Sequence, residues 1–243
     1  MIFQGKLLNI KVKIPVAKAS KIPIAVLIGD GSKLQAILQV AKNPKSKFYI
    51  AFVISHKKES SGINLALQNN IPAVYFNLPD FRKRFKKDAK SAYMKFLGWF
   101  ISQKQYSPEL LVFAGWDLVV DKKFLNYFKS NFGNGFASIN LHPALLPVEN
   151  EGNKIPLPDK TFSPIIRGEQ KEVLQEVLDR KLTYFGPTVH FVAEKYDSGK
   201  VIKREFIKVS GAKTVNELRE KLLPIEDKIL VEAINEVVNK YLL

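Results

Sequence analysis

Asn140 and His142 are the residues whose types and spacing best suit catalysis, two positions apart at the end of an apolar run typical of a buried strand. Because side chains i and i+2 lie on the same face of a strand, the amide and the imidazole point the same way. An amide donor beside an imidazole can stabilise a developing oxyanion and shuttle a proton, which is what acyl transfer requires. The alternative is a pair of hydrogen-bonded polar residues that closes a strand end.

Asp197 is the carboxylate that would complete such a site. Near His142 it would favour the imidazolium and orient it, although its place before Gly199 also suits an ordinary turn former. The sequence alone does not bring residues 142 and 197 together. His190 lies in the middle of another apolar run, and we interpret it as a satisfied, partly buried residue. No paired histidines with metal-ligand spacing occur, so we expect no metal.

A glycine-containing turn follows the first apolar run. Its glycines let a ligand approach the backbone, and Ser32 with Gln35 has the spacing of a capping box at the start of a helix. The free amides of a first helical turn bind anions, so we predict a phosphate site. The alternative is the ordinary strand-to-helix turn of this fold class. The residues of the predicted phosphate site are Gly29, Asp30, Gly31, Ser32 and Lys33.

Strand and helix patterns alternate over the first 140 residues or so, which predicts an α/β fold with a doubly wound, mostly parallel sheet. We expect an N-terminal extension over residues 1–21 and a single domain over 22–243 that ends in a helix. The expected strands are 22–28, 48–54, 73–76, 110–114 and 136–141, and the expected helices are 34–41, 63–68, 89–104 and 122–128.

The pattern changes after Leu146. Four prolines between 147 and 164 predict a long loop. We then expect a short helix over 169–178 and two strands over 188–193 and 200–209. Thr214 and Glu217 form a capping box for a final helix that runs to about residue 240, with a kink at Pro224.

The composition, 46% hydrophobic and 25% charged, is that of a globular protein. No apolar run is long enough to cross a membrane and the sequence has no cysteine. Residues 1–21 lack the apolar centre and cleavage site of a secretory signal, so we expect no such signal and a cytoplasmic protein. The net charge of +15 attracts anions. A dense basic run over 82–87 is either a solvated loop or helix start, or a patch for polyphosphate or RNA.

Four segments together resemble the folate-dependent formyltransferases, most closely the purine-synthesis branch. The resemblance implies transfer of a formyl group from 10-formyltetrahydrofolate, as co-substrate, to a primary amine, here that of glycinamide ribonucleotide. It also implies that Asn140, His142 and Asp197 are the catalytic residues. The segments that carry it are Val26 to Ala36, Val112 to Trp116, Ile139 to Pro147, and Gly186 to Val192 with Tyr196 to Ile202.

The resemblance further implies binding sites for both substrates. The loop 29–33 would receive the substrate phosphate, and Lys90 and Glu226 would contact the rest of that substrate. The folate would lie against Gly115, Trp116, Asp117, Leu118, Val119 and Val120.

The partners we expect are therefore small molecules, a phosphoribosyl amine and a folate, for a monomer or homodimer. Two alternatives stay open. Relatives that formylate a nucleotide sugar or methionyl-tRNA share the same three residues, although the sequence of the 29–36 loop favours the purine branch. A basic, non-catalytic module that binds nucleic acid on the same fold is the alternative that the charge suggests.

Overall fold

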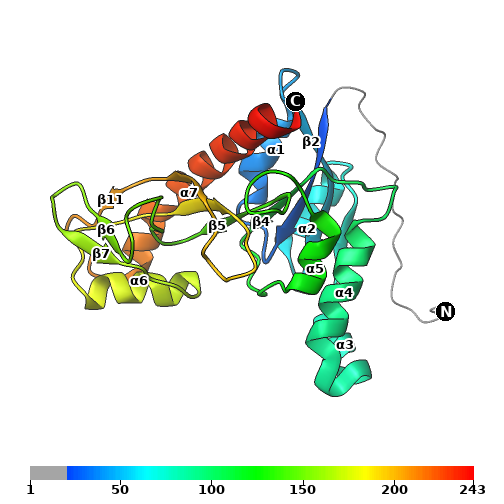
Figure 1. The fold of residues 1–243 in the computed structure, drawn as a ribbon, viewed down its shortest axis with the longest axis horizontal. Helices are drawn as coiled ribbons and strands as arrows, with labels where there is room; N and C mark the ends of the chain where they lie inside the picture. Colours follow the sequence, from blue (N-terminus) through cyan, green and yellow to red (C-terminus); the bar gives the residue numbers. More distant parts are fainter. Residues whose placement is uncertain (1–20) are drawn as a thin grey trace.

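The computed structural model describes residues 21–243, so all of the expected extension except Lys21 lies outside the described residues. At its centre is a seven-stranded sheet in the order β10-β9-β5-β4-β1-β2-β3 (Figure 1). The first five strands in sequence are parallel, β9 is antiparallel to β5, and β10 is antiparallel to β9. The mostly parallel sheet is thus confirmed. The strands are β1 (Ile22–Ile28), β2 (Phe48–Ser55), β3 (Ala73–Tyr75), β4 (Leu110–Ala114), β5 (Ser138–His142), β9 (Thr188–Phe191) and β10 (Val201–Arg204).

Helices cover both faces of this sheet, which is why its strands are apolar almost without interruption. In β1, Ile24, Val26 and Ile28 join a core on one face, whereas Ala25 and Leu27 join the core on the other. Helices α1 (Leu34–Lys42), α2 (Ser61–Gln68) and α7 (Val215–Val237) pack on the first face, and α4 (Ala89–Ile101) and α5 (Lys122–Leu125) pack on the second. Short turns of 3-10 or π helix follow at Lys86–Asp88, Asn126–Phe128 and Val238–Leu242.

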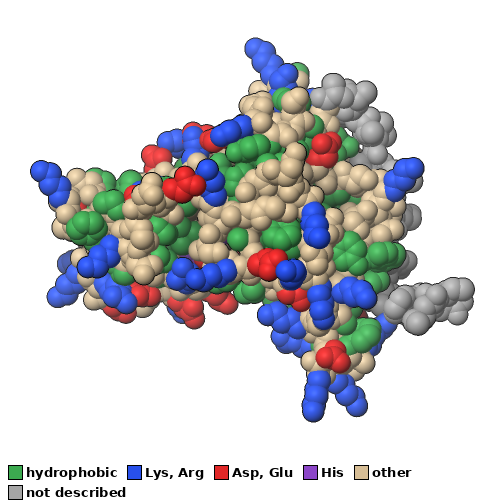
Figure 2. All heavy atoms as spheres, viewed as in Figure 1, with side chains coloured by type: hydrophobic (Ala, Val, Ile, Leu, Met, Phe, Trp, Pro, Cys, Tyr) green, Lys and Arg blue, Asp and Glu red, His purple; other side chains and the backbone are tan. Residues whose placement is uncertain are grey.

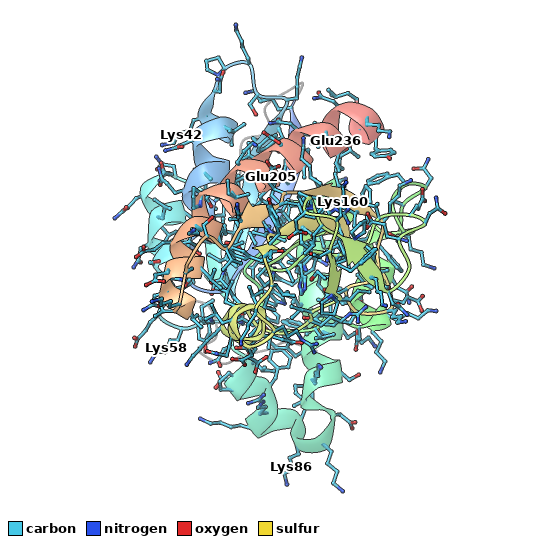
Figure 3. The ribbon with its side chains drawn as sticks, turned by 90° about the vertical axis from the view of Figure 1, so that its left-hand side faces the viewer. Lys42, Lys58, Lys86, Lys160, Glu205 and Glu236 are labelled. Atoms are coloured by element: carbon cyan, nitrogen blue, oxygen red, sulfur yellow. The ribbon has the colours of Figure 1, made fainter. Side chains whose placement is uncertain are left out.

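Helix α3 (Leu78–Phe85) was not expected from the sequence; it extends away from the body beside α4 (Figure 1). The basic run over 82–87 is exposed at its end, where Lys86 lies at the far tip (Figure 3). Lys and Arg side chains are also spread over the rest of the visible surface (Figure 2). The charge of the chain is therefore distributed and not confined to this projection.

The region after β5 differs from the expectation in two respects. The proline-containing segment holds a small hairpin of β6 (Lys154–Pro156) and β7 (Phe162–Pro164). Ile155 of this hairpin is buried in a small apolar cluster that is separate from the cores of the main sheet. The single strand expected over 200–209 is broken: β10 joins the main sheet, and β11 (Ile207–Lys208) pairs with β8 (Tyr184–Phe185). Helix α6 (Gln170–Asp179) packs against the first part of α7.

The last helix begins where it was predicted, with half of the expected capping box present. The Thr214 side chain accepts a hydrogen bond from the Glu217 amide at 3.2 Å, and the helix continues past Pro224 to Val237. Within residues 21–243, no helix is both long and apolar enough to cross a membrane.

Candidate active site

A cavity of about 320 Å³ lies at the carboxyl ends of β1, β4 and β5. Open α/β sheets bind their ligands at this edge, because the turns that leave the parallel strands gather there. The segments that line it are the turn after β1, residues 115–120 after β4, the end of β5, the loop after β9, and the start of α6 with part of α7.

Asn140 and His190 lie directly opposite each other on the antiparallel strands β5 and β9. The Asn140 amide nitrogen is 3.2 Å from His190 Nε2, and His190 Nδ1 is 2.8 Å from the carbonyl oxygen of Phe191. Since a carbonyl only accepts, Nδ1 carries the proton and Nε2 accepts from Asn140. This arrangement fixes which way the amide points and leaves its second N–H for a ligand.

His142 lies on the same face of β5, two residues further on. Its Nδ1 is 3.4 Å from Oδ2 of Asp197, and its Nε2 is 3.1 Å from the carbonyl oxygen of Ile166. The other Asp197 oxygen is 3.6 Å from His190 Nε2. The structure thus brings together the three residues that the sequence could not connect.

Asp197 has a constrained position. Its backbone has φ of 47°, a left-handed conformation that aspartate tolerates better than most residues. Two residues later the chain must pass close to β9: a Cβ atom on Gly199 would lie 1.7 Å from the carbonyl oxygen of Phe191. Glycine at 199 therefore allows the turn that delivers the carboxylate.

Burial affects the charge of His142 and the hydrogen bonding of Asp197. Burial lowers the pKa of His142, although Asp197 and the Ile166 carbonyl both act to raise it. At the same time Asp197 Oδ2 is buried and accepts no hydrogen bond from residues 21–243. Because Nε2 donates to Ile166, Nδ1 of the neutral ring has no proton to give to Asp197. A proton taken up at Nδ1 would supply the missing hydrogen bond.

The capping box of Ser32 and Gln35 expected in the turn after β1 does not form, so that prediction is wrong. Helix α1 begins at Leu34 with Lys33 at its N-cap, and no side chain in residues 21–243 caps it. Asp30 accepts the Ser32 amide at 3.0 Å instead, so its side chain folds back onto its own turn. Gly31 has φ of 98°, and a Cβ there would lie 2.4 Å from Gly62, so the turn is fixed against the start of α2.

Lys33 and Glu226 come together although they are far apart in sequence. The Lys33 ammonium is 2.7 Å from a Glu226 oxygen, and both side chains line the cavity while being almost fully buried. Gln170, at the start of α6, also donates to Glu226, at 3.1 Å. Sequence reasoning named Lys33 and Glu226 but did not pair them, and it missed Gln170 entirely.

The segment expected to contact folate lines one side of the cavity. A mostly apolar wall forms on this side of the cavity, closed at the rim by an ion pair of 2.8 Å between Lys57 and Asp117. Burial lowers the pKa of His56, which lies 3.4 Å from the same carboxylate. The six predicted residues that line the cavity are Gly115, Trp116, Asp117, Leu118, Val119 and Val120.

The structure changes two of the sequence-based assignments. Lys90 is exposed on α4 and does not line the cavity, although the resemblance placed it near the substrate. His190, which the sequence suggested was only structural, contacts both Asn140 and Asp197. The alternation of residues along β9 places His190 on one face of the strand, and this was the only indication of its role in the sequence. The sequence does not give the register between β9 and β5 that brings His190 opposite Asn140.

Known proteins share this fold, and their sequences align with most of this chain. The formyl transferase family model matches residues 22–234. Phosphoribosylglycinamide formyltransferase of Dictyostelium discoideum is 30% identical over 87% of this chain and 95% of its own length. The trifunctional purine biosynthetic protein adenosine-3 of Bos taurus is 29% identical over 89% of this chain, which spans 18% of that longer protein.

A solved structure agrees with these matches. Glycinamide ribonucleotide transformylase 1 from Symbiobacterium toebii superposes with a TM-score of 0.70, at 26% identity, over 90% of this chain and 88% of that one. The family model, the sequence relatives and the fold converge on the same segment of the chain. This protein belongs to the formyl transferase family.

Proposed function

We propose that the protein transfers a formyl group from 10-formyltetrahydrofolate to the amine of glycinamide ribonucleotide. The observation that carries this proposal is that one cavity holds Asn140, His142 and Asp197 together with the turn after β1. The first three groups suit acyl transfer to an amine, and the turn lies at the N-terminus of α1, a position that favours binding of a phosphate. The relatives of similar length, from Dictyostelium discoideum and Schizosaccharomyces pombe, are named for this activity.

His142 first acts as the proton acceptor. Because burial lowers its pKa, the ring is neutral in the free protein and can take the proton that the attacking amine must lose. Nδ1 receives it, since Nε2 donates to Ile166. The protonated His142 expected from the sequence therefore forms during the reaction. Asp197, 3.4 Å away, stabilises the new charge and keeps the proton available for the leaving nitrogen.

Asn140 acts on the oxygen of the formyl group. Its amide is held by His190, so the second N–H is already oriented before substrate arrives. A pre-oriented donor of this kind lowers an acyl-transfer barrier by about 3 to 4 kcal/mol. The imidazolium formed at His142 adds positive charge on the same face of β5.

The residues present fit a reduced folate. The cavity combines apolar side chains, among them Trp116, Leu118 and Val192, with the polar groups of Asn140 and Asp197, which suits a flat ring with polar edges. When bound, the folate supplies a formyl group on a nitrogen that can leave. The residues after Gly115 would hold the ring, and those of β5 would meet the formyl group.

The proposal is tested by incubating the protein with 10-formyltetrahydrofolate and glycinamide ribonucleotide while following the folate absorbance. Asn140→Ala should lower turnover by about 10²- to 10³-fold, and His142→Ala should also be severely impaired. Asn64→Ala removes an exposed amide on α2 and should leave turnover unchanged. Methionyl-tRNA and an amino-sugar nucleotide are offered as other acceptors. No turnover with glycinamide ribonucleotide, or full turnover by Asn140→Ala, would contradict the proposal.

A further inference from the structure

The projection of α3 and α4 is strongly basic. Residues 78–101 contain seven Lys or Arg and two Asp, so their net charge is +5, and all seven basic side chains are exposed. None of the seven forms an ion pair within residues 21–243, whereas basic residues elsewhere, such as Lys122 and Lys203, pair with glutamates. Lys and Arg therefore gather on the projection without paired counter-charges (Figure 2).

Four aromatic rings of the projection form a row. Between ring centroids, Phe81 lies 5.6 Å from Phe85 and 5.8 Å from Phe96, and Phe96 lies 5.1 Å from Trp99. The two inner rings are partly buried, whereas Phe85 is 42% and Trp99 is 45% exposed. The row thus presents one aromatic ring to solvent at each of its ends.

The two exposed rings lie far apart along the projection. Phe85 precedes Lys86, which lies at the far tip (Figure 3), whereas Trp99 lies near the end of α4 that returns to the body (Figure 1). At about 1.5 Å per residue, Trp99 lies about 15 Å along the helix axis from Ala89. Lys95 is exposed one turn before Trp99, on the same side of the helix. A ligand that contacts both rings and these cations must be extended and anionic.

We propose that the projection binds single-stranded nucleic acid, with phosphates on its lysines and arginines and with bases stacked on Phe85 and Trp99. Such a strand is extended and anionic, and every base has a flat face that stacks on an aromatic ring whatever the sequence. No residue of 78–101 lines the cavity at the carboxyl ends of the strands, so this surface is separate from the site of formyl transfer.

The charge and the position of the rings favour this ligand over three others. A second copy of the chain would bring two basic projections together, which their charges oppose. A duplex keeps its bases paired inside, so it offers phosphates but no base to stack. A lipid surface is flat and would meet the tip, where Lys86 lies, while Trp99 lies back toward the body.

Fluorescence anisotropy with a labelled, mixed-sequence RNA strand of about 12 nucleotides tests the charge. The parent should bind with a Kd of about 10⁻⁵ M or lower at about 50 mM salt. Arg82→Gln/Lys83→Gln/Arg84→Gln should weaken binding about tenfold or more. It should also make the slope of log K against log salt shallower by about 2, because each phosphate contact of a single strand contributes about 0.7.

The matched control removes the same charge from the other end of the molecule. Lys42, Lys45 and Lys47 are exposed and form no ion pair within residues 21–243, and Lys42 lies at the end opposite Lys86 (Figure 3). Lys42→Gln/Lys45→Gln/Lys47→Gln should change the affinity less than about twofold at the same salt, since only the projection combines cations with exposed rings in this proposal.

Substitutions at the two exposed rings test stacking. Trp99→Leu keeps an apolar side chain but removes the ring, so it should weaken binding at least about fivefold, whereas Trp99→Phe should stay within about twofold of the parent. Phe85→Leu makes the same test at the tip. Phe162→Ala removes an exposed ring from β7 and should have no effect. Circular dichroism checks that each variant is folded.

The proposal is overturned if the two triple variants bind equally well, or if a folded Trp99→Leu or Phe85→Leu binds like the parent. It is also overturned if an RNA duplex of the same sequence competes as well as the strand, because stacking would then contribute nothing. Vesicles of phosphatidylcholine and phosphatidylserine are the last arm: binding to these vesicles without binding to the strand would assign the surface to lipid and overturn the proposal.

Discussion

Replacing Asp197 by asparagine removes a charge without changing size, and the structure allows its effect to be estimated. The carboxylate is 1% exposed, and its Oδ2 lies 3.4 Å from His142 Nδ1. Two unit charges at this separation interact by about 5 kcal/mol at an effective dielectric constant of 20. Because His142 gains its charge only during the reaction, most of this energy is used in the transition state. We expect Asp197→Asn to lower kcat by about 10³-fold, with little change in KM for the acceptor.

The pH profile gives a second, independent readout. Asp197 raises the pKa of His142 against the larger, opposite effect of burial. Without the carboxylate that pKa falls further. The acid limb of kcat/KM, which reports the protonation of His142 in the free enzyme, should therefore lie below pH 6.5 in the parent and shift to still lower pH in the variant.

Glu194→Gln is the matched control. Glu194 lies in the same loop and lines the same cavity, but it is 53% exposed and paired with Lys122. Its loss should change kcat less than twofold. The role assigned to Asp197 is refuted if Asp197→Asn loses less than about tenfold in kcat while remaining folded, or if its acid limb moves to higher pH.

Other regions of the structure give further predictions. Burial lowers the pKa values of His142 and His56, so the unfolded chain binds protons that the folded chain does not. The free energy of unfolding in urea should fall by up to about 1.4 kcal/mol per pH unit for each histidine as the pH drops below 6.5. His56→Gln should reduce this slope, and a slope unaffected by that change would contradict the assignment. Gly199→Ala places a Cβ atom 1.7 Å from a β9 carbonyl, so melting followed by circular dichroism should show a loss of about 2 kcal/mol or more, and turnover should fall with it. An unchanged melting temperature would exclude this steric role. Arg204 donates to both oxygens of Glu151 at 2.5 and 2.6 Å in a mostly buried pair, and Arg204→Met should cost about 2 to 3 kcal/mol in urea unfolding. Arg204→Met/Glu151→Leu should recover most of that loss, because no charge is then left unpaired.

The central sheet could be predicted from the sequence because its strands are buried on both faces. A run such as Ile22 to Ile28 has few other stable structures, and its observed bounds match the expected ones. The strand expected over 136–141 is displaced to Ser138–His142. Phe136 forms only an isolated bridge with Lys129, so its apolar character reflects burial and not a place in the sheet.

The region between β5 and α7 could not be predicted, because contacts distant in sequence fix it. Arg204 holds Glu151 and the carbonyl oxygen of Leu146 at once, which ties the proline-containing segment to β10. The strands there are two to four residues long, too short for alternation to mark them. Two short strands, β10 and β11, therefore read as one.

The candidate site likewise contains residues whose relation could be predicted from local sequence and residues whose contacts only the structure shows. The spacing of Asn140 and His142 showed that they share a face, since that follows from the period of a strand. The place of Asp197 came from the resemblance, and its contact with His142 came only from the structure. The pair of Lys33 and Glu226 joins the turn after β1 to the last helix, and no local pattern connects them.

The antiparallel strand β9 explains how one face of the sheet can hold the whole site. His190 lies opposite Asn140 in the body of the sheet, and because β9 is antiparallel to β5 its chain then leaves toward the edge where β5 begins. The loop after β9 must then fold back over that face, since Asp197 contacts both His142 and His190. The left-handed backbone of Asp197 and the absence of a side chain at Gly199 are the local conditions for this return. The strand that orients the amide therefore also delivers the carboxylate, so a change in the turn should disturb both groups together.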